Sequence, residues 1–182
     1  MTKVVNLNKL VDNSKRRHVH HHNNIQLIFD TEIILKTLIG RIKKADTKYI
    51  MGCAAWFTNT KLIECMSNHL RGVSMICTRD KVARTKHSKA KYKKLPKAHG
   101  IPTIRLLGSG SGRSASLMHH KFLVGLDKDQ MPIWVSTGSF NLTESAKTNI
   151  ENLMIIEDKD VAMSFLEEFQ RLYPLAKTLS LR

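Results

Sequence analysis

Two short stretches of the sequence carry side chains suited to phosphate chemistry, and the first is His119-His120-Lys121 within the apolar run 117–126. Side chains alternate along a strand, so His119 and Lys121 face one way while His120 faces the other. An imidazole can attack phosphorus or carry a proton, and an ammonium stabilises charge on phosphoryl oxygens. The spacing therefore predicts a phosphate-handling patch formed by His119 and Lys121.

The second stretch runs from Gly138 to Asn141 and follows the next apolar run, 132–137. Gly138 permits a tight turn, while Ser139 and Asn141 supply a hydroxyl and an amide as further donors to phosphate oxygens. A short helix predicted to begin at Asn141 would add backbone N–H groups that favour anions. Each stretch alone has an ordinary interpretation, as a chance His-x-Lys or a common turn. Their ordered pairing across one hairpin is far more specific.

This ordered pair resembles the signature of the phospholipase D superfamily: His-x-Lys, four residues, Asp, then Gly-Ser and an Asn one residue further. It resembles especially the single-motif branch of bacterial Nuc-like endonucleases and mitochondrial Zucchini-like relatives, over roughly residues 30–172. The resemblance implies that Glu151, in "NIENLMII", steadies His119 through its Nδ1–H. The catalytic set that it implies is His119, Lys121, Ser139, Asn141 and Glu151.

One position departs from the family pattern, because the acid stands at Asp127 and the family position is Leu126. If the motif is counted from His120 instead of His119, Asp127 stands at the family's acid position. Phe122 then stands at the position of the family's lysine. A one-residue bulge in this strand would reconcile the two counts. We therefore expect Asp127, His120 and Gly138 to support the catalytic set rather than to belong to it. An exchange of roles between His119 and His120 stays open.

The number of motifs bears on assembly, because family members use two His-Lys sets and this chain has one. The resemblance implies that one histidine forms a phosphohistidine while the other protonates the leaving oxygen. A symmetric homodimer would bring two copies of His119 to one shared site. No cluster of acids suited to Mg²⁺ lies near the motif, so we expect catalysis without a metal or other cofactor.

The charge of the chain indicates its substrate. There are 30 Lys+Arg against 15 Asp+Glu, a net charge of +15 and a pI near 10.0, which favours nucleic acid or an anionic membrane surface. Residues 79–97 hold nine of the basic residues and one acid, although such a segment is often only a solvated loop. The predicted contacts to a nucleic-acid backbone are Arg79, Lys81, Arg84, Lys86, Lys89, Lys91, Lys93, Lys94, Arg105 and Arg113.

These features favour an endonuclease with little sequence specificity, acting on DNA rather than RNA. Tyr92 is the one aromatic residue in the basic segment, so this segment offers few rings on which nucleobases could stack. One alternative is a hydrolase of anionic phospholipid, which should carry an apolar anchor or an amphipathic basic helix; neither is evident. Another alternative is a protein that binds nucleic acid but has lost catalytic activity. The shifted position of Asp127 keeps this alternative open.

Hydrophobic periodicity predicts the elements that position these residues. The predicted helices begin near Asp30, within 58–72, at Asn141 and at 160, and the predicted strands are 48–56, 73–78, 103–107, 119–126, 132–137 and 152–157. The expected fold is α/β, a mixed and mostly parallel sheet with helices on both faces, similar to that of phospholipase D. We expect one domain at 25–182, preceded by a flexible basic arm at 1–24 and interrupted by a Gly/Ser linker at 108–116.

Three remaining features bear on where the protein acts. No apolar run approaches the roughly 20 residues of a membrane span, and the N-terminus lacks a signal-peptide pattern, so we expect a cytoplasmic protein. A nonspecific nuclease without an export signal would endanger its host, which is consistent with a phage, mobile-element or defence role, or with tight control of its activity. Cys53, Cys65 and Cys77 are expected to be reduced core residues. The histidine-rich segment 18–22 is either an incidental metal ligand or a polar tail.

Overall fold

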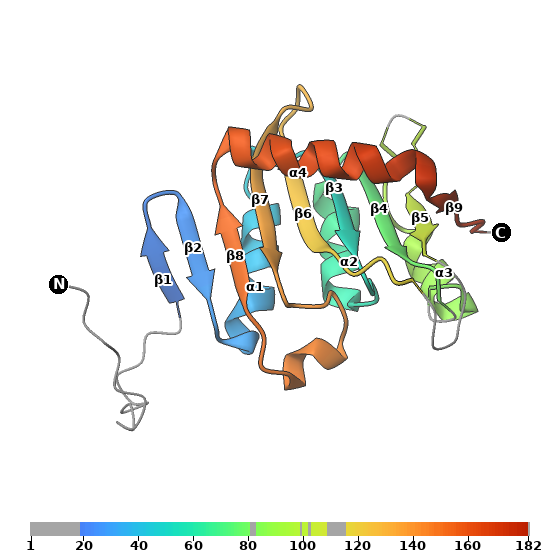
Figure 1. The fold of residues 1–182 in the computed structure, drawn as a ribbon, viewed down its shortest axis with the longest axis horizontal. Helices are drawn as coiled ribbons and strands as arrows, with labels where there is room; N and C mark the ends of the chain where they lie inside the picture. Colours follow the sequence, from blue (N-terminus) through green and yellow to red (C-terminus); the bar gives the residue numbers. More distant parts are fainter. Residues whose placement is uncertain (1–18, 81–82, 99, 102, 109–115, 182) are drawn as a thin grey trace.

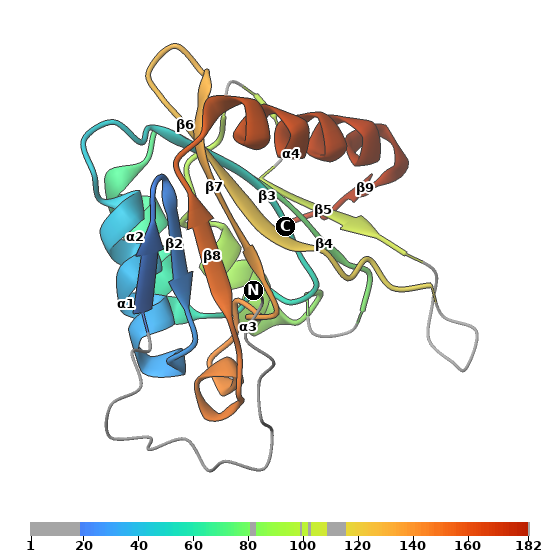
Figure 2. The ribbon, with the colours of Figure 1, turned by 60° about the vertical axis from the view of Figure 1, so that its left-hand side comes forward.

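The computed structural model describes residues 19–80, 83–98, 100–101, 103–108 and 116–181. They form a nine-stranded sheet in the order β1-β2-β8-β7-β6-β3-β4-β5-β9. Helices α1, α2 and α3 cover one face of this sheet, and the long helix α4 covers the other (Figures 1 and 2). The predicted α/β class with helices on both faces is confirmed.

The bounds of the elements are as follows. The strands are β1 (Val19–His22), β2 (Ile25–Ile28), β3 (Tyr49–Ala54), β4 (Gly72–Thr78), β5 (Ile104–Leu107), β6 (Lys121–Leu126), β7 (Pro132–Gly138), β8 (Leu153–Ile156) and β9 (Lys177–Thr178). The helices are α1 (Thr31–Ile42), α2 (Thr60–His69), α3 (Lys86–Tyr92) and α4 (Lys159–Leu172), with the 3₁₀ helices η2 (Ser145–Thr148) and η3 (Tyr173–Leu175).

The sheet is mixed, but the prediction that it is mostly parallel is wrong. Only the pairings of β3 with β4 and of β4 with β5 are parallel among the described strands. These two pairings have helical crossovers, through α2 and α3, as parallel neighbours require. After β5 the chain returns beside β3 and continues through β6, β7 and β8 as an antiparallel meander. The connection from β6 to β7 is a short hairpin, whereas residues 139–152 between β7 and β8 form a longer loop that contains η2.

Most of the predicted helices and strands are present, and their ends follow local chemistry. Asp30 caps α1, as expected, because its Oδ1 accepts the backbone N–H groups of Glu32 and Ile33 at 2.9 and 3.4 Å. The three cysteines are buried and free, as expected, and burial raises the pKa of Cys53 to about 12. No helix in the described part of the chain is long and apolar enough to cross a bilayer.

Three predicted boundaries change. Residues 19–22 pair with β2 around an Asn23-Asn24 turn, with a φ of 50° at Asn23, so ordered structure begins before residue 25. No helix starts at Asn141, because Leu142 bridges to Phe57 and only the 3₁₀ turn η2 follows. The basic segment contains the helix α3, which sequence periodicity did not indicate. Residues 1–18, and 109–115 of the predicted linker, lie outside the described residues.

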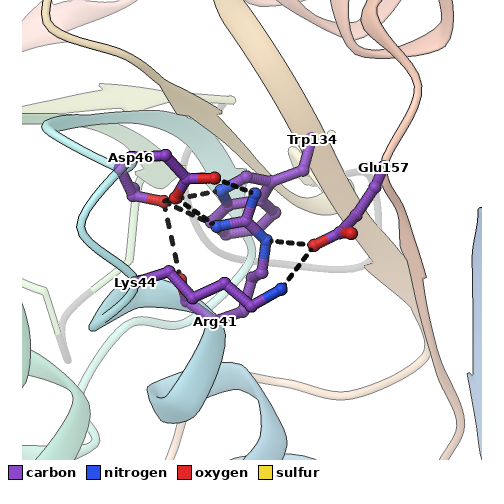
Figure 3. Close-up of polar contacts among 6 residues, drawn as sticks. Arg41, Lys44, Asp46, Trp134 and Glu157 are labelled. Carbon is purple, nitrogen blue, oxygen red and sulfur yellow. Dashed lines mark hydrogen bonds and ion pairs between the residues drawn. The ribbon is translucent and has the colours of Figure 1, made fainter.

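A polar network closes the edge of the sheet where β7 begins (Figure 3). The Arg41 side chain is only 6% exposed, and its Nη1 and Nη2 donate to the two carboxylate oxygens of Asp46 at 2.9 and 3.2 Å. Its Nε lies 2.6 Å from Glu157 Oε1, and its guanidinium carbon lies 5.1 Å from the ring centre of Trp134. Thr47 completes the network by accepting a hydrogen bond from Trp134 Nε1 at 3.0 Å. The network therefore ties α1 to the loop after it and to the ends of β7 and β8.

The network makes stability depend on pH. Burial by itself raises the pKa of Asp46 and of Glu157, but hydrogen bonds and charge from Arg41 and Lys44 outweigh it and lower both values. Carboxylates with lowered pKa stabilise the fold above their ordinary values of 3.8 and 4.5, and this stabilisation is lost as pH falls through their folded pKa values.

We therefore expect Arg41→Met to lower the free energy of unfolding at pH 7 by about 2 kcal/mol, because it removes the buried guanidinium's bonds to Asp46 and Glu157, while Glu157 keeps Lys44. The deficit should shrink as pH falls from 5 towards 3. Urea denaturation at several pH values measures it, with Lys44→Met as the matched control, because Lys44 is 56% exposed and should cost under about 0.5 kcal/mol. Equal losses for the two variants at every pH would contradict this account.

Candidate active site

The predicted catalytic residues meet at one edge of the sheet, the lower edge in Figure 1. There β3 and β7 end while β6 and β8 begin, since Ala54 is opposite Lys121 and Gly138 is opposite Leu153. This register brings together five residues from three separate segments of the chain: His119, Lys121, Ser139, Asn141 and Glu151.

The two histidines face opposite sides of the sheet, as the strand alternation predicts. Lys121 Nζ lies 3.2 Å from His119 Nδ1 and donates to the His119 carbonyl oxygen at 3.1 Å. His120 instead has its Nε2 3.2 Å from Glu168 Oε1 of α4. The pairing of His119 with Lys121 supports His119, rather than His120, as the reactive histidine.

Glu151 lies in the site, but its contacts differ from the expected ones. Ser139 Oγ donates to Glu151 Oε2 at 2.5 Å, and Asn149 Nδ2 donates to Glu151 Oε1 at 3.3 Å. The expected hydrogen bond from His119 Nδ1 to this carboxylate is replaced, because Lys121 Nζ lies against that nitrogen. Burial lowers the pKa of Lys121, and the charge of Glu151 partly opposes that shift. Glu151 therefore holds Ser139 directly and acts on Lys121 through its charge.

Gly138 is needed because β7 and β8 approach closely at the site. A Cβ at this position would lie 2.4 Å from the carbonyl oxygen of Asn152, which is closer than atoms can pack. The same carbonyl accepts the N–H of Ser139 at 3.2 Å, and Asn152 N donates to Ser139 Oγ at 3.0 Å. The support predicted for Gly138 is thus steric, and it places the Ser139 hydroxyl beside Glu151.

Trp56 and Asp80 also belong to this edge, although they lie outside the two sequence motifs. The rings of Trp56 and His119 are nearly perpendicular, at 88°, with their centres 6.0 Å apart. Trp56 Nε1 donates to Asp80 Oδ2 at 2.5 Å, which fixes the indole. Both residues directly follow strands that end here, and α/β sheets tend to bind ligands beyond such strand ends. That placement was the available signal in the sequence.

Asp127 does not belong to the site. Its Oδ1 accepts the N–H groups of Asp129 and Met131, both at 2.9 Å, and so caps the hairpin between β6 and β7. This hairpin is six residues from Lys121, roughly 20 Å along a strand. The expected bulge in β6 is also wrong, since β6 pairs with β3 without a shift and Ile133 of β7 is the extra residue. Asp127 supports the fold rather than the chemistry.

The basic segment adjoins the site through α3. Lys91 Nζ donates to the carbonyl oxygen of Thr58 at 3.0 Å, and Tyr92 OH donates to that of Phe57 at 2.7 Å. Tyr92 is buried and stacks on Phe57, so it cannot stack on a base. The residues that remain exposed for a polyanion on or beside α3 are Arg79, Arg84, Lys86, Lys93 and Lys94, with Lys89 and Lys91 half-buried.

The other predicted basic contacts have different outcomes. Arg105 is occupied elsewhere, since its guanidinium donates to the carbonyl oxygen of Ala176 and to Thr178 Oγ1 and covers the ring of Tyr173 at 4.2 Å. It fastens the C-terminal segment to β5. Lys81 and Arg113 lie outside the described residues. Within the described ranges, no group of three or more His, Cys, Asp or Glu side chains is placed to hold a metal ion.

Comparison with known proteins places the site in a family. A family model described as "Cardiolipin synthase, PLD-like domain" matches residues 38–173, most of the chain and all of the residues at the site. The chain belongs to the phospholipase D-like family. Its similarity to an uncharacterized protein of Acanthamoeba polyphaga mimivirus is 26% identity over 208 residues, 94% of this chain and 72% of that protein. A phospholipase D of Rickettsia prowazekii is 28% identical over 138 residues, 74% of this chain and 60% of that protein.

Solved structures of this family share the fold. NucT from Helicobacter pylori superposes with a TM-score of 0.68 at 17% identity, covering 85% of this chain and 98% of the other. Nuc from Salmonella typhimurium superposes with a TM-score of 0.61 at 21% identity, covering 85% and 97%. The predicted phospholipase D-like fold is confirmed.

The lowered pKa of Lys121 predicts how the rate of phosphodiester cleavage depends on pH. As pH rises through this lowered pKa, the Lys121 ammonium loses its proton. We therefore expect kcat/KM to begin falling at a pH lower than 10.5, the ordinary pKa of lysine. Lys121→Arg keeps the charge to higher pH, so its lower rate should show no such alkaline fall. The measurement is the pH profile of methyl p-nitrophenyl phosphate hydrolysis. An identical alkaline fall in both proteins would exclude Lys121 as its cause.

Proposed function

We propose that this protein is an endonuclease that cleaves nucleic acid, DNA in preference to RNA, with little sequence specificity and no metal ion. The observation that supports this most directly is the His119–Lys121 pair, which lies at one sheet edge with Ser139, Asn141 and Glu151. We further propose that two copies of the chain form a homodimer with one shared active site, because one imidazole cannot serve as both nucleophile and acid in the same step.

The chemistry can be assigned residue by residue. The attacking nitrogen must carry no proton, so Lys121 leaves His119 Nδ1 for a phosphoryl oxygen, Nδ1 holds the ring proton, and Nε2 attacks phosphorus. The bond to the leaving oxygen breaks, and His119 of the partner subunit gives that oxygen its proton. Water then attacks the phosphohistidine while His119 of the partner subunit takes a proton from it, which releases the phosphate and restores both imidazoles. Lys121 and Asn141 supply donors to the phosphoryl oxygens as charge develops. Ser139 joins them by turning its one hydroxyl hydrogen from Glu151 to the phosphate. Glu151 is a positioning residue, because it holds Ser139.

The substrate is argued from charge. The exposed basic residues on and around α3 lie beside the segment that follows Trp56, next to the site. Such charges bind a polyanion backbone without reading its sequence. Binding should therefore weaken steeply as salt rises. Similarity to the mimivirus protein is compatible with origin in a virus or mobile element.

A lipid phosphodiester is the second candidate. Mitochondrial cardiolipin hydrolase of Canis lupus familiaris is 44% identical over 57 residues, which cover 31% of this chain and 20% of that protein. The chemistry at phosphorus would be the same for either substrate. The third candidate, a nucleic-acid-binding protein without catalysis, would bind the polyanion and cleave neither substrate.

A parallel assay with plasmid DNA and cardiolipin vesicles, both in EDTA, separates these candidates. We expect nicking of the plasmid and no lipid turnover, and His119→Ala should lower the nicking rate at least about 10³-fold because it removes the nucleophile. His120→Ala is the matched control: it removes the neighbouring imidazole from the α4 side and should lower the rate less than about tenfold. Lipid turnover alone, or activity that returns only with Mg²⁺, would refute the proposal.

Subunit mixing tests the shared site. When His119→Ala and wild-type chains are co-refolded in equal amounts, mixed dimers lack one of the two histidines and should be inactive. Activity should then be about a quarter of that of wild type alone, because only wild-type pairs are active in a symmetric dimer. Activity of half the wild-type value, in simple proportion to dilution, would show that each subunit works by itself.

A further inference from the structure

A pocket of about 450 Å³ opens beside Trp56, whose ring contacts that of His119, among the residues that follow β3 and β7. Trp56 and Asn141 form part of its wall, and Thr58, Thr143 and Glu144 complete most of the remainder. Its volume lies within the range of roughly 300–1,000 Å³ that is typical of small-ligand sites. The reaction assigned above uses Asn141 but leaves the rest of the pocket without a role.

The charge of the pocket argues against a second phosphate. None of the described residues that line it is a lysine or arginine, and Glu144 brings a carboxylate, whose Oε1 accepts the N–H of Thr60 at 2.7 Å. The oxygens of its wall suit a neutral group with N–H donors better than an anion. Lys91 donates to the carbonyl oxygen of Thr58 at this wall, and the exposed basic residues lie around α3.

The shape of the pocket is set by a rigid aromatic ring. Trp56 is held by its hydrogen bond to Asp80 at 2.5 Å and by its perpendicular contact with His119. A fixed, partly exposed indole provides a surface for stacking a planar group. Stacking on such a ring strengthens nucleic-acid binding by roughly 5- to 150-fold per base.

The polar wall carries an unmet hydrogen bond. Asn141 Oδ1 is buried and has no donor among the described residues. Buried acceptors are nearly always paired, so one left unpaired beside a pocket points to a group supplied by a ligand. The N–H groups on the edges of nucleobases are donors of the required kind.

We propose that this pocket is a subsite for one base of the nucleotide next to the phosphodiester that is cleaved. The base stacks on Trp56 and donates a hydrogen bond to Asn141, which brings its phosphate towards His119. This inference rests on the proposed function, because it assigns the nucleoside part of the same substrate. Every base has a planar face and hydrogen-bonding edge groups, so the subsite accepts any base and reads no sequence.

Intrinsic fluorescence tests binding without relying on catalysis. The chain has two tryptophans, Trp56 and the fully buried Trp134 at the other end of β7. Thymidine 5′-monophosphate should quench the emission in a saturable way, and ribose 5-phosphate, which has no base, should not. In Trp56→Phe only Trp134 emits, so the quenching should vanish. Equal effects of the two ligands on the wild-type protein, or no effect of either, would overturn the subsite.

A pair of synthetic esters tests the same subsite during catalysis. We compare kcat/KM for thymidine 5′-(p-nitrophenyl phosphate) with that for methyl p-nitrophenyl phosphate, which carries no base. The wild-type preference for the nucleoside ester should be about tenfold or more, and Trp56→Leu should reduce it to within about twofold. If both rates fall by the same factor and the preference stays, Trp56 only positions His119, and the subsite is refuted.

The two assays also separate this inference from the proposed function. If the wild-type protein cleaves neither ester nor plasmid, the nuclease proposal fails, and the fluorescence titration still decides whether the pocket holds a base. If plasmid and both esters are cleaved without preference and thymidine 5′-monophosphate has no effect, the nuclease proposal survives and the subsite does not.

Discussion

The active site depends on the close approach of β7 and β8, where the backbone at Gly138 passes the carbonyl oxygen of Asn152. This contact brings the turn after β7 against the segment before β8, so the Ser139 hydroxyl meets the Glu151 carboxylate. The pairing of β7 with β6 then sets these residues beside His119 and Lys121. A side chain at position 138 would separate the two halves of the site without altering any reactive group.

Much of the fold and the core of the site could be predicted because both depend on short-range patterns. Helical spacing in α1 and α4, and the alternation that separates His119 from His120, are local properties of the chain. The helix α3 was missed because it has few apolar residues and is held largely through Tyr92. The sheet was expected to be mixed but mostly parallel, and the predominance of antiparallel pairs was missed, since strand direction is set by where the chain returns after β5.

The remaining errors concern contacts between residues far apart in the sequence. Glu151 was placed correctly at the site, but its hydrogen bond goes to Ser139 because Lys121 already lies against His119 Nδ1. Asp127 was ambiguous in a linear count and is clear in three dimensions, where it caps a hairpin at the other end of β6. Arg105 looked like one more free cation, although its guanidinium binds the C-terminal segment.

The two ends of the sheet have different roles. One end is tied by the Arg41 network, and the other exposes the reactive groups. The reactive end draws on residues after β3, after β4, before β6, after β7 and before β8. These parts can therefore assemble only once the ribosome has synthesised the chain through β8, and a product truncated ahead of Glu151 would lack the carboxylate that holds Ser139.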